Sequence, residues 1–255
     1  RQMSARRLMV GGNWKCNGTM GFAKSFPADV LNKLKFDPKK VEVVVAPAAL
    51  HISTVQSVLK NNVHVATQNL SLTGDGAYTG EFSIAMVKDM NISYTLTGHS
   101  ERRTLYHETD KDVAKKTKLA VDQGFTVLAC IGELLGERES GKTKDVNNRQ
   151  LNAIREECED WSKIVIAYEP VWAIGTGKTA TPQIAQDTHA EIREWLAANV
   201  SKEAAASVRI LYGGSVTDAN AAELIAMEDI DGFLVGGASL KPAFHQIVEA
   251  CQNAK

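Results

Sequence analysis

Short apolar runs alternate with stretches of helical spacing along the whole chain, and no other sequence feature constrains the fold as strongly. The apolar runs predict strands at residues 8–12, 41–46, 63–67, 94–97, 126–131, 163–167, 208–212 and 232–235. The stretches between them predict helices at residues 20–35, 51–60, 83–89, 111–123, 146–161, 182–199, 218–227 and 242–251. Strands joined through helices predict a parallel sheet, because parallel neighbours need a long crossover connection.

Eight strand–helix units are the number that closes into a (β/α)₈ barrel, a fold of about 250 residues, and the chain has 255. An open, doubly wound sheet is the alternative arrangement of the same units. No composition break, linker or low-complexity tract divides the chain. We therefore expect the α/β class and a single domain over residues 1–255, with a parallel eight-stranded inner barrel. Arg1 and Gln2 precede Met3, as a cloning remnant would.

The charge balance and the cysteine spacing argue against several classes of partner. The chain carries 29 Lys and Arg residues against 30 Asp and Glu residues, so its overall field predicts no nucleic-acid or membrane partner, and any anion must be bound locally. The cysteines, Cys16, Cys130, Cys158 and Cys251, have neither metal-ligand nor C-x-x-C spacing. Because no signal peptide or membrane span is recognisable, we expect reduced cysteines, no bound metal and a cytoplasmic location.

Glu169 stands where the sixth predicted strand ends and a loop begins. Pro170 biases the backbone of Glu169 away from the helical region, so the acid is held on a stiff strand end. The loop that follows is apolar at positions 171–174 and carries Gly175 and Gly177, unlike a loop that only faces water. A rigid acid before an apolar, glycine-bearing flap is typical of a catalytic base beneath a closing lid.

Three other interpretations of this loop are weaker. Residues 175–179 end like a P-loop, but that motif needs glycine where Trp172 stands. Gly175, Gly177 and Ala180 fit a dinucleotide fingerprint, yet residues 169–174 separate them from the strand end. A surface loop with an exposed acid leaves the apolar flap unexplained.

Other polar residues follow the first and fourth predicted strands, at the barrel end where reactive groups belong. Asn13 and Lys15 follow the first strand, although Lys15 alone is better interpreted as a surface cation. His99 and Ser100 follow the fourth, and a helix that begins there would keep His99 neutral. Glu101 is the predicted counter-charge of Lys15.

Paired glycines follow the seventh and eighth strands. Gly213 and Gly214 precede Ser215, and Gly236 and Gly237 precede a predicted helix start. Either pair alone is best explained as a tight turn, but two pairs on neighbouring strands predict a nest of backbone N–H groups for a phosphate.

These segments together resemble the triosephosphate isomerase family, in family order and spacing from residue 11 to residue 240. The motifs are NWKCN at 13–17, GHSERR at 98–103, AYEPVWAIGTGK at 167–178, YGGSV at 212–216 and GFLVGGASL at 232–240. The resemblance implies a TIM barrel that isomerises dihydroxyacetone phosphate and D-glyceraldehyde 3-phosphate through an enediolate, without cofactor or metal. Thr97 and His107 depart from the family pattern and put the packing near the fourth strand in doubt.

The resemblance also implies roles for individual residues. It places the general base at Glu169, the neutral electrophile at His99 and the substrate-binding lysine at Lys15. Substrate contacts fall on Asn13, Lys15, Gly175, Ser215, Gly236 and Gly237, and supporting positions on Ser100, Glu101, Cys130 and Tyr212. The lid falls on Pro170, Val171, Trp172, Ala173, Ile174, Gly175, Thr176, Gly177, Lys178, Thr179 and Ala180.

The family is dimeric through a long loop, which resembles residues 69–81 with Gly76, Ala77, Tyr78 and Thr79 at its centre. The resemblance therefore implies a homodimer in which Thr79 approaches Asn13 and Lys15 of the other subunit. Two other functions remain alternatives: another phosphosugar isomerase or epimerase on the same barrel, and a non-catalytic phosphate-binding barrel.

Overall fold

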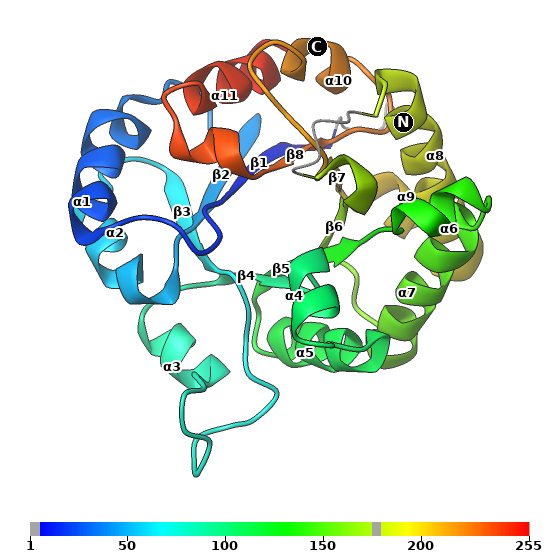
Figure 1. Ribbon diagram of the computed structural model, residues 1–255, viewed down its shortest axis with the longest axis horizontal. Helices are drawn as coiled ribbons and strands as arrows, with labels where there is room; N and C mark the ends of the chain where they lie inside the picture. The colour runs from blue at the N-terminus through cyan, green and yellow to red at the C-terminus, as the bar shows by residue number, and fades with distance from the viewer. Residues whose placement is uncertain (1–5, 175–179, 255) are drawn as a thin grey trace.

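The computed structural model describes residues 6–174 and 180–254. Eight parallel strands close into a barrel in sequence order, and β8 pairs with β1 (Figure 1). The strands are β1 Leu8–Asn13, β2 Val41–Ala46, β3 Val63–Thr67, β4 Tyr94–Thr97, β5 Thr126–Ile131, β6 Ile164–Tyr168, β7 Ile210–Tyr212 and β8 Gly232–Val235. The predicted (β/α)₈ barrel is confirmed, and the open sheet is wrong because its edge strands pair with each other.

Helices surround the barrel on its outside (Figure 1). They are α1 Met20–Asp29, α2 Ile52–Val58, α3 Ile84–Asp89, α4 Ser100–Leu105, α5 Asp110–Asp122, α6 Leu135–Glu139, α7 Thr143–Glu157, α8 Pro182–Asn199, α9 Lys202–Ser207, α10 Ala221–Ile225 and α11 Phe244–Asn253. Single 3₁₀ turns occur at Leu31–Lys33, Ala49–His51, Val171–Ala173 and Gly237–Leu240. Within residues 6–174 and 180–254, no helix combines the length and the apolar character needed to cross a membrane.

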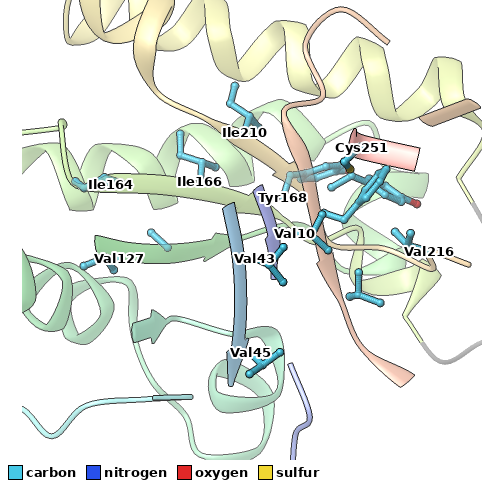
Figure 2. Close-up of a cluster of buried hydrophobic side chains, with 14 of the residues drawn as sticks. Val10, Val43, Val45, Val127, Ile164, Ile166, Tyr168, Ile210, Val216 and Cys251 are labelled. Atoms are coloured by element: carbon cyan, nitrogen blue, oxygen red, sulfur yellow. The ribbon is translucent and has the colours of Figure 1, made fainter. Parts of the chain in front are cut away.

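Alternate residues of each strand enter two separate cores, one between strands and helices and one inside the barrel. In β2, Val43 and Val45 face the helices, where Figure 2 shows them in the outer cluster, whereas Val44 and Ala46 face the barrel interior. Since both faces of the sheet are covered, the strands are mostly apolar. Each fully buried aliphatic side chain contributes about 1.5–3 kcal/mol to folding.

The helices differ from the predicted ones in number and length. The helix predicted at 20–35 ends at Asp29, and a separate 3₁₀ turn follows. Pro27 lies inside α1 and cannot donate to the preceding turn, and the side chain of Asn32 hydrogen-bonds instead to the backbone of Val58 and Lys60. The helix predicted at 146–161 begins earlier, at Thr143, and ends at Glu157, while α6 and α9 were not predicted.

Both departures from the family pattern near β4 are accommodated locally. The hydroxyl of Thr97 is buried and lies 2.9 Å from that of Thr117 on α5, so each satisfies the other. His107 has a φ of 57°, a left-handed conformation that favours glycine. Thr97 is thus accommodated by a hydroxyl partner, and His107 by a left-handed backbone conformation that is more costly for histidine than for glycine.

Candidate active site

Glu169 follows β6 directly and is almost completely buried, with 2% of its surface exposed. Val165 and Ala167 face the barrel interior, so the next residue of the same parity, Glu169, also points toward the barrel axis. Its backbone N–H donates to the carbonyl oxygen of Ile131 at 2.7 Å and continues the ladder between β5 and β6. A Cβ atom on Gly213 would lie 2.9 Å from Cγ of Glu169, so glycine directly after β7 leaves room for this side chain.

Both carboxylate oxygens of Glu169 are in contact with the segment after β4. Oε2 accepts from the backbone N–H of Ser100 at 3.0 Å, and Oε1 lies 2.8 Å from Nε2 of His99. Ser100 is the first residue of α4, so the positive end of that helix faces the carboxylate. The buried charge is therefore stabilised by two donors in contact with it.

His99 caps the N-terminus of α4 through its ring. Nδ1 accepts from the backbone N–H of Glu101 at 3.2 Å, which requires a lone pair on Nδ1. The hydrogen-bond partners therefore assign the ring proton to Nε2, which faces Glu169. Burial lowers the pKa of His99, but the carboxylate of Glu169 outweighs burial and raises that pKa above its usual value. Once Glu169 moves away, burial opposes a charge on His99, as the sequence-based expectation of a neutral ring requires.

Lys15 reaches the same place from β1. Its φ is 55°, an uncommon backbone conformation for a lysine, and its N–H donates to Oδ1 of Asn13 at 3.0 Å. Its Nζ donates to Glu101 at 2.7 Å, the contact that the sequence predicted. Nε2 of Gln68 donates to the carbonyl oxygen of Lys15 at 2.8 Å and supports this conformation.

One cavity of about 420 Å³ brings these groups together at the carboxyl ends of the strands. Among the residues that line it are Asn13, Lys15, His99, Glu169, Ser215, Gly236 and Gly237. They lie at or just beyond the carboxyl ends of β1, β4, β6, β7 and β8. Ser215 follows the glycine pair after β7, and a 3₁₀ turn begins at Gly237, as the glycine pattern predicted. Every predicted substrate-binding residue that the structure describes therefore faces this cavity.

The predicted lid begins close to a buried carboxylate that the sequence did not single out. Val171–Ala173 form a 3₁₀ turn, and Nε1 of Trp172 donates to Glu133 at 2.9 Å. Glu133 has no exposed surface and also accepts from the hydroxyl of Tyr168 at 3.1 Å. Of the predicted lid residues, Gly175, Thr176, Gly177, Lys178 and Thr179 lie outside the described residues.

Arg138 completes the environment of this buried carboxylate. Its Nη1 donates to Glu133 at 3.2 Å, and its guanidinium lies 4.9 Å from the ring centre of Trp172. Arg138 lies in a charged run, residues 137–139, of the kind that usually faces solvent, yet its guanidinium contacts both Glu133 and Trp172. The position of Glu133, two residues beyond β5, is the signal that could have indicated the contact.

The other predicted supporting residues, Cys130 and Tyr212, are not among the residues that line the cavity. Cys130 lies inside the barrel, where burial and then the charge of Glu169 raise the pKa of its thiol well above the usual value. Burial also raises the pKa of Tyr212 to about 12, against a smaller opposing effect of the Ala180 backbone. Within the part of the chain that the structure describes, no group of three or more His, Cys, Asp or Glu side chains is placed to hold a metal ion.

Comparison with known proteins agrees with this geometry. The triosephosphate isomerase family profile matches residues 8–251. A triosephosphate isomerase of Coprinopsis cinerea is 52% identical over 247 residues, which cover 96% of this chain and 98% of the relative. The cytosolic enzyme of Oryza sativa subsp. japonica is 50% identical over 246 residues, 96% of this chain and 97% of the relative. The chloroplastic enzyme of Fragaria ananassa is 50% identical over 250 residues, 98% of this chain and 79% of the relative. The chain therefore belongs to the triosephosphate isomerase family.

Proposed function

We propose that the cavity at the carboxyl ends of the strands isomerises a triose phosphate, interconverting dihydroxyacetone phosphate and D-glyceraldehyde 3-phosphate through an enediolate. One observation carries this proposal: Lys15, His99 and Glu169, which lie far apart in the sequence, line a single cavity of about 420 Å³. Family membership over nearly the whole chain supports the same reaction.

Glu169 is proposed as the general base. It removes the proton from the carbon next to the carbonyl group, which gives the enediolate, and returns that proton to the neighbouring carbon. Its carboxylate now contacts Ser100 and His99, so it must exchange these contacts for the substrate.

His99 is proposed as the electrophile that moves a proton between the two substrate oxygens. Its Nε2 proton faces the cavity, and its Nδ1 is held by the N–H of Glu101. A neutral imidazole can donate its Nε2 proton to one enediolate oxygen and then accept a proton from the other. No buried cation forms in either step. Lys15 and Asn13 bind the oxygens beside it and offset the developing negative charge. A carboxylate base paired with a neutral histidine is the established division of labour in the triosephosphate isomerase family, to which the chain belongs.

The phosphate is proposed to bind on the opposite side of the cavity. Gly236, Gly237 and Ser215 present backbone N–H groups and a hydroxyl there, next to the start of a 3₁₀ turn. Cε of Lys15 lies 3.7 Å from where a Cβ of Gly236 would stand, so the ammonium group also approaches this side. Gly175 is proposed to add one more N–H.

Closure of residues 170–180 is proposed to exclude water from the enediolate. Ile174 already lines the cavity, and Ala180 is buried at the other end of the segment. Tyr212 is proposed to hold the closed segment through its hydroxyl, which is buried and has no hydrogen-bond partner among the described residues. A dry site strengthens the hydrogen bonds to the enediolate and suppresses loss of the phosphate.

A homodimer is proposed from the segment between β3 and α3, which projects from the barrel (Figure 1). Gly76, Ala77, Tyr78 and Thr79 are exposed at its centre. A second cavity of about 240 Å³, lined by Asn13 and other site residues, lies where this loop of a second copy would enter. Large exposed apolar side chains, among them Leu50, Leu72, Met86, Leu105 and Tyr106, would be covered in the dimer.

We further propose that residues 1–255 form one domain and that the protein is cytoplasmic. All four cysteines are free, which suits a reducing compartment. Related proteins carry both cytosolic and chloroplastic names, so the location requires its own measurement by fractionation of the source cells.

A coupled assay of glyceraldehyde 3-phosphate conversion, with and without EDTA, tests the proposed reaction. We expect turnover that the chelator does not change. Turnover that EDTA abolishes would favour a metal-dependent epimerase, and tight phosphate binding without turnover would favour a non-catalytic barrel.

A further inference from the structure

Gln150 reaches from α7 to Gly132 and satisfies both polar groups of its backbone. Oε1 of Gln150 accepts from the N–H of Gly132 at 2.8 Å, and Nε2 donates to its carbonyl oxygen at 3.3 Å. β5 ends at Ile131, so Gly132 is the first residue beyond that strand, at the end of the barrel that carries the site. A buried helix side chain, 4% exposed, thus supplies the pairing that a neighbouring strand would otherwise provide.

Gly132 in turn packs directly against the backbone of Glu169. A Cβ atom at position 132 would lie 1.7 Å from the carbonyl oxygen of Glu169. The N–H of Glu169 donates to Ile131 at 2.7 Å, and the N–H of Val171 donates to Glu133 at 3.2 Å. Glu169 and Val171 are therefore held by Ile131 and Glu133, the residues on both sides of Gly132, and a displacement of one segment moves the other.

A cavity of about 450 Å³, separate from the one that holds the proposed substrate site, borders this contact. Gly132, Gln150, Glu169 and Val171 are among the residues that line it. Protein interiors are otherwise closely packed. The open space here therefore means that side-chain packing alone restrains this side of Glu169 only partly. The two hydrogen bonds of Gln150 therefore carry much of the restraint on Gly132.

We propose that Gln150 is a positioning residue for the isomerase reaction, which fixes the backbone of Glu169 through Gly132 without touching the substrate. This proposal rests on the role of Glu169 as the general base. A displacement of about 1 Å in a reacting group can cost about 100-fold in rate. The groups proposed to bind the substrate phosphate lie on other strands, so loss of Gln150 should lower kcat and leave KM nearly unchanged.

The first test compares Gln150→Met with Gln186→Met in steady-state kinetics. Gln186 on α8 is a matched control, because its amide also makes two hydrogen bonds, at 2.7 Å and 3.0 Å, but to Asp229 ahead of β8. We expect Gln150→Met to lower kcat about 10-fold to 100-fold with KM within about threefold, and Gln186→Met to keep the wild-type kcat. Equal losses in the two variants, or a wild-type kcat for Gln150→Met, would overturn the proposal.

The second test uses Gln150→Glu, which preserves the size of the side chain and serves if the methionine variant does not fold. An ionised carboxylate at this position can accept from the N–H of Gly132 but repels its carbonyl oxygen. A protonated carboxyl group restores the missing donor, and burial favours that protonated form. The ratio of variant to wild-type kcat should therefore rise as the pH falls from about 8 to about 6. A ratio that stays constant over this range would contradict the positioning role.

The third test asks whether Gln150 acts through Glu169. If it does, the loss of kcat in the double variant Gln150→Met with Glu169→Asp is smaller than the product of the two single losses. Losses that multiply would show an independent effect and overturn the proposal. An unchanged kcat in Glu169→Asp alone would instead refute the proposed base, so the two failures are distinguishable.

Discussion

Oε1 of Glu169 lies 2.8 Å from Nε2 of His99, although the two residues follow different strands, β6 and β4. The proposed base and the proposed electrophile therefore contact each other while no substrate lies between them. The carboxylate that raises the pKa of His99 is also the group that must leave to reach the substrate carbon. On the proposed mechanism, substrate binding separates the pair and removes the interaction that favours a charged ring.

Glu169→Asp is expected to lower kcat by about 100-fold, because the carboxylate retreats by one methylene from the carbon it must reach. KM should change little, since the proposed phosphate contacts are untouched. Steady-state kinetics in both reaction directions measures the two parameters. Equal losses of affinity and turnover would contradict the role of Glu169 as the base.

Gly213→Ala is expected to lower kcat about tenfold by crowding Glu169. The new Cβ would lie 2.9 Å from Cγ of Glu169 and 3.1 Å from the carbonyl oxygen of Tyr168, so one of them must shift. Overpacking of this kind destabilises a protein by about 1–3 kcal/mol. Gly136→Ala is the control, because a Cβ there meets nothing within 4 Å, and it should keep full kcat. Full activity of the Gly213 variant would show that this close contact does not position the base.

The buried ring of His189 is expected to make the folded protein less stable in acid. The ring is fully buried, its Nδ1 lies 3.1 Å from the carbonyl oxygen of Asp229, and burial lowers its pKa to about 4. The unfolded chain binds the proton near pH 6.5 and the folded chain does not, so stability falls as the pH drops from about 6.5 to about 4. This group alone contributes about 3 kcal/mol to that loss.

Urea unfolding at several pH values, compared between the wild type and His189→Gln, measures this contribution. The variant has no group that titrates at this position, so its free energy of unfolding should change less over the same pH range. Identical pH profiles would show that the imidazole does not remain neutral in the folded state.

Glu42→Gln is expected to destabilise the protein without changing kcat. Glu42 is 5% exposed at the amino end of the barrel, and it accepts from Arg7 at 3.0 Å and from the hydroxyl of Tyr94 at 2.7 Å. Burial would raise its pKa, but Arg209 and the other donors outweigh burial and hold the pKa below its usual value. Removing the charge leaves the partly exposed guanidinium groups of Arg7 and Arg209 without a charged partner, at a cost of about 1–3 kcal/mol.

Denaturant unfolding and kinetics on the same preparation test the separation of stability from activity at the two ends of the barrel. Asp187→Asn, at an exposed position on α8, is the control and should stay within about 0.5 kcal/mol of the wild type. A Glu42 variant that kept its stability but lost turnover would show that the amino end of the barrel takes part in the reaction.

The strands were predicted closely because each is a short apolar run with its own boundaries. Five of them match the predicted residues, β1 is one residue longer, and β6 and β7 begin later than predicted. Helix ends were less predictable: the helical spacing of residues 20–35 continues past Asp29, where Pro27 and the contacts of Asn32 end α1. Propensity is local, whereas such contacts come from distant segments.

The site was predicted where a residue stands within two positions of a strand end, as Lys15, His99 and Glu169 do. The role of Gln150 was not predicted, because this residue lies in the middle of a helix. The pattern of residues along that helix does not reveal that Gln150 contacts the backbone of Gly132. The contacts of Arg138 were not predicted either, because a charged run usually faces solvent and its partners, Glu133 and Trp172, lie on other segments.

By itself, the sequence determined the alternation of strands and helices, the parallel sheet and the strand ends at which the polar residues stand, because these follow from periodicity along neighbouring residues. Only the tertiary structure decided that β8 closes on β1, that Glu169 contacts His99 and that Gln150 pairs with Gly132. Each of these depends on the distance between segments far apart in the chain, which the closure of the barrel sets and no local pattern encodes.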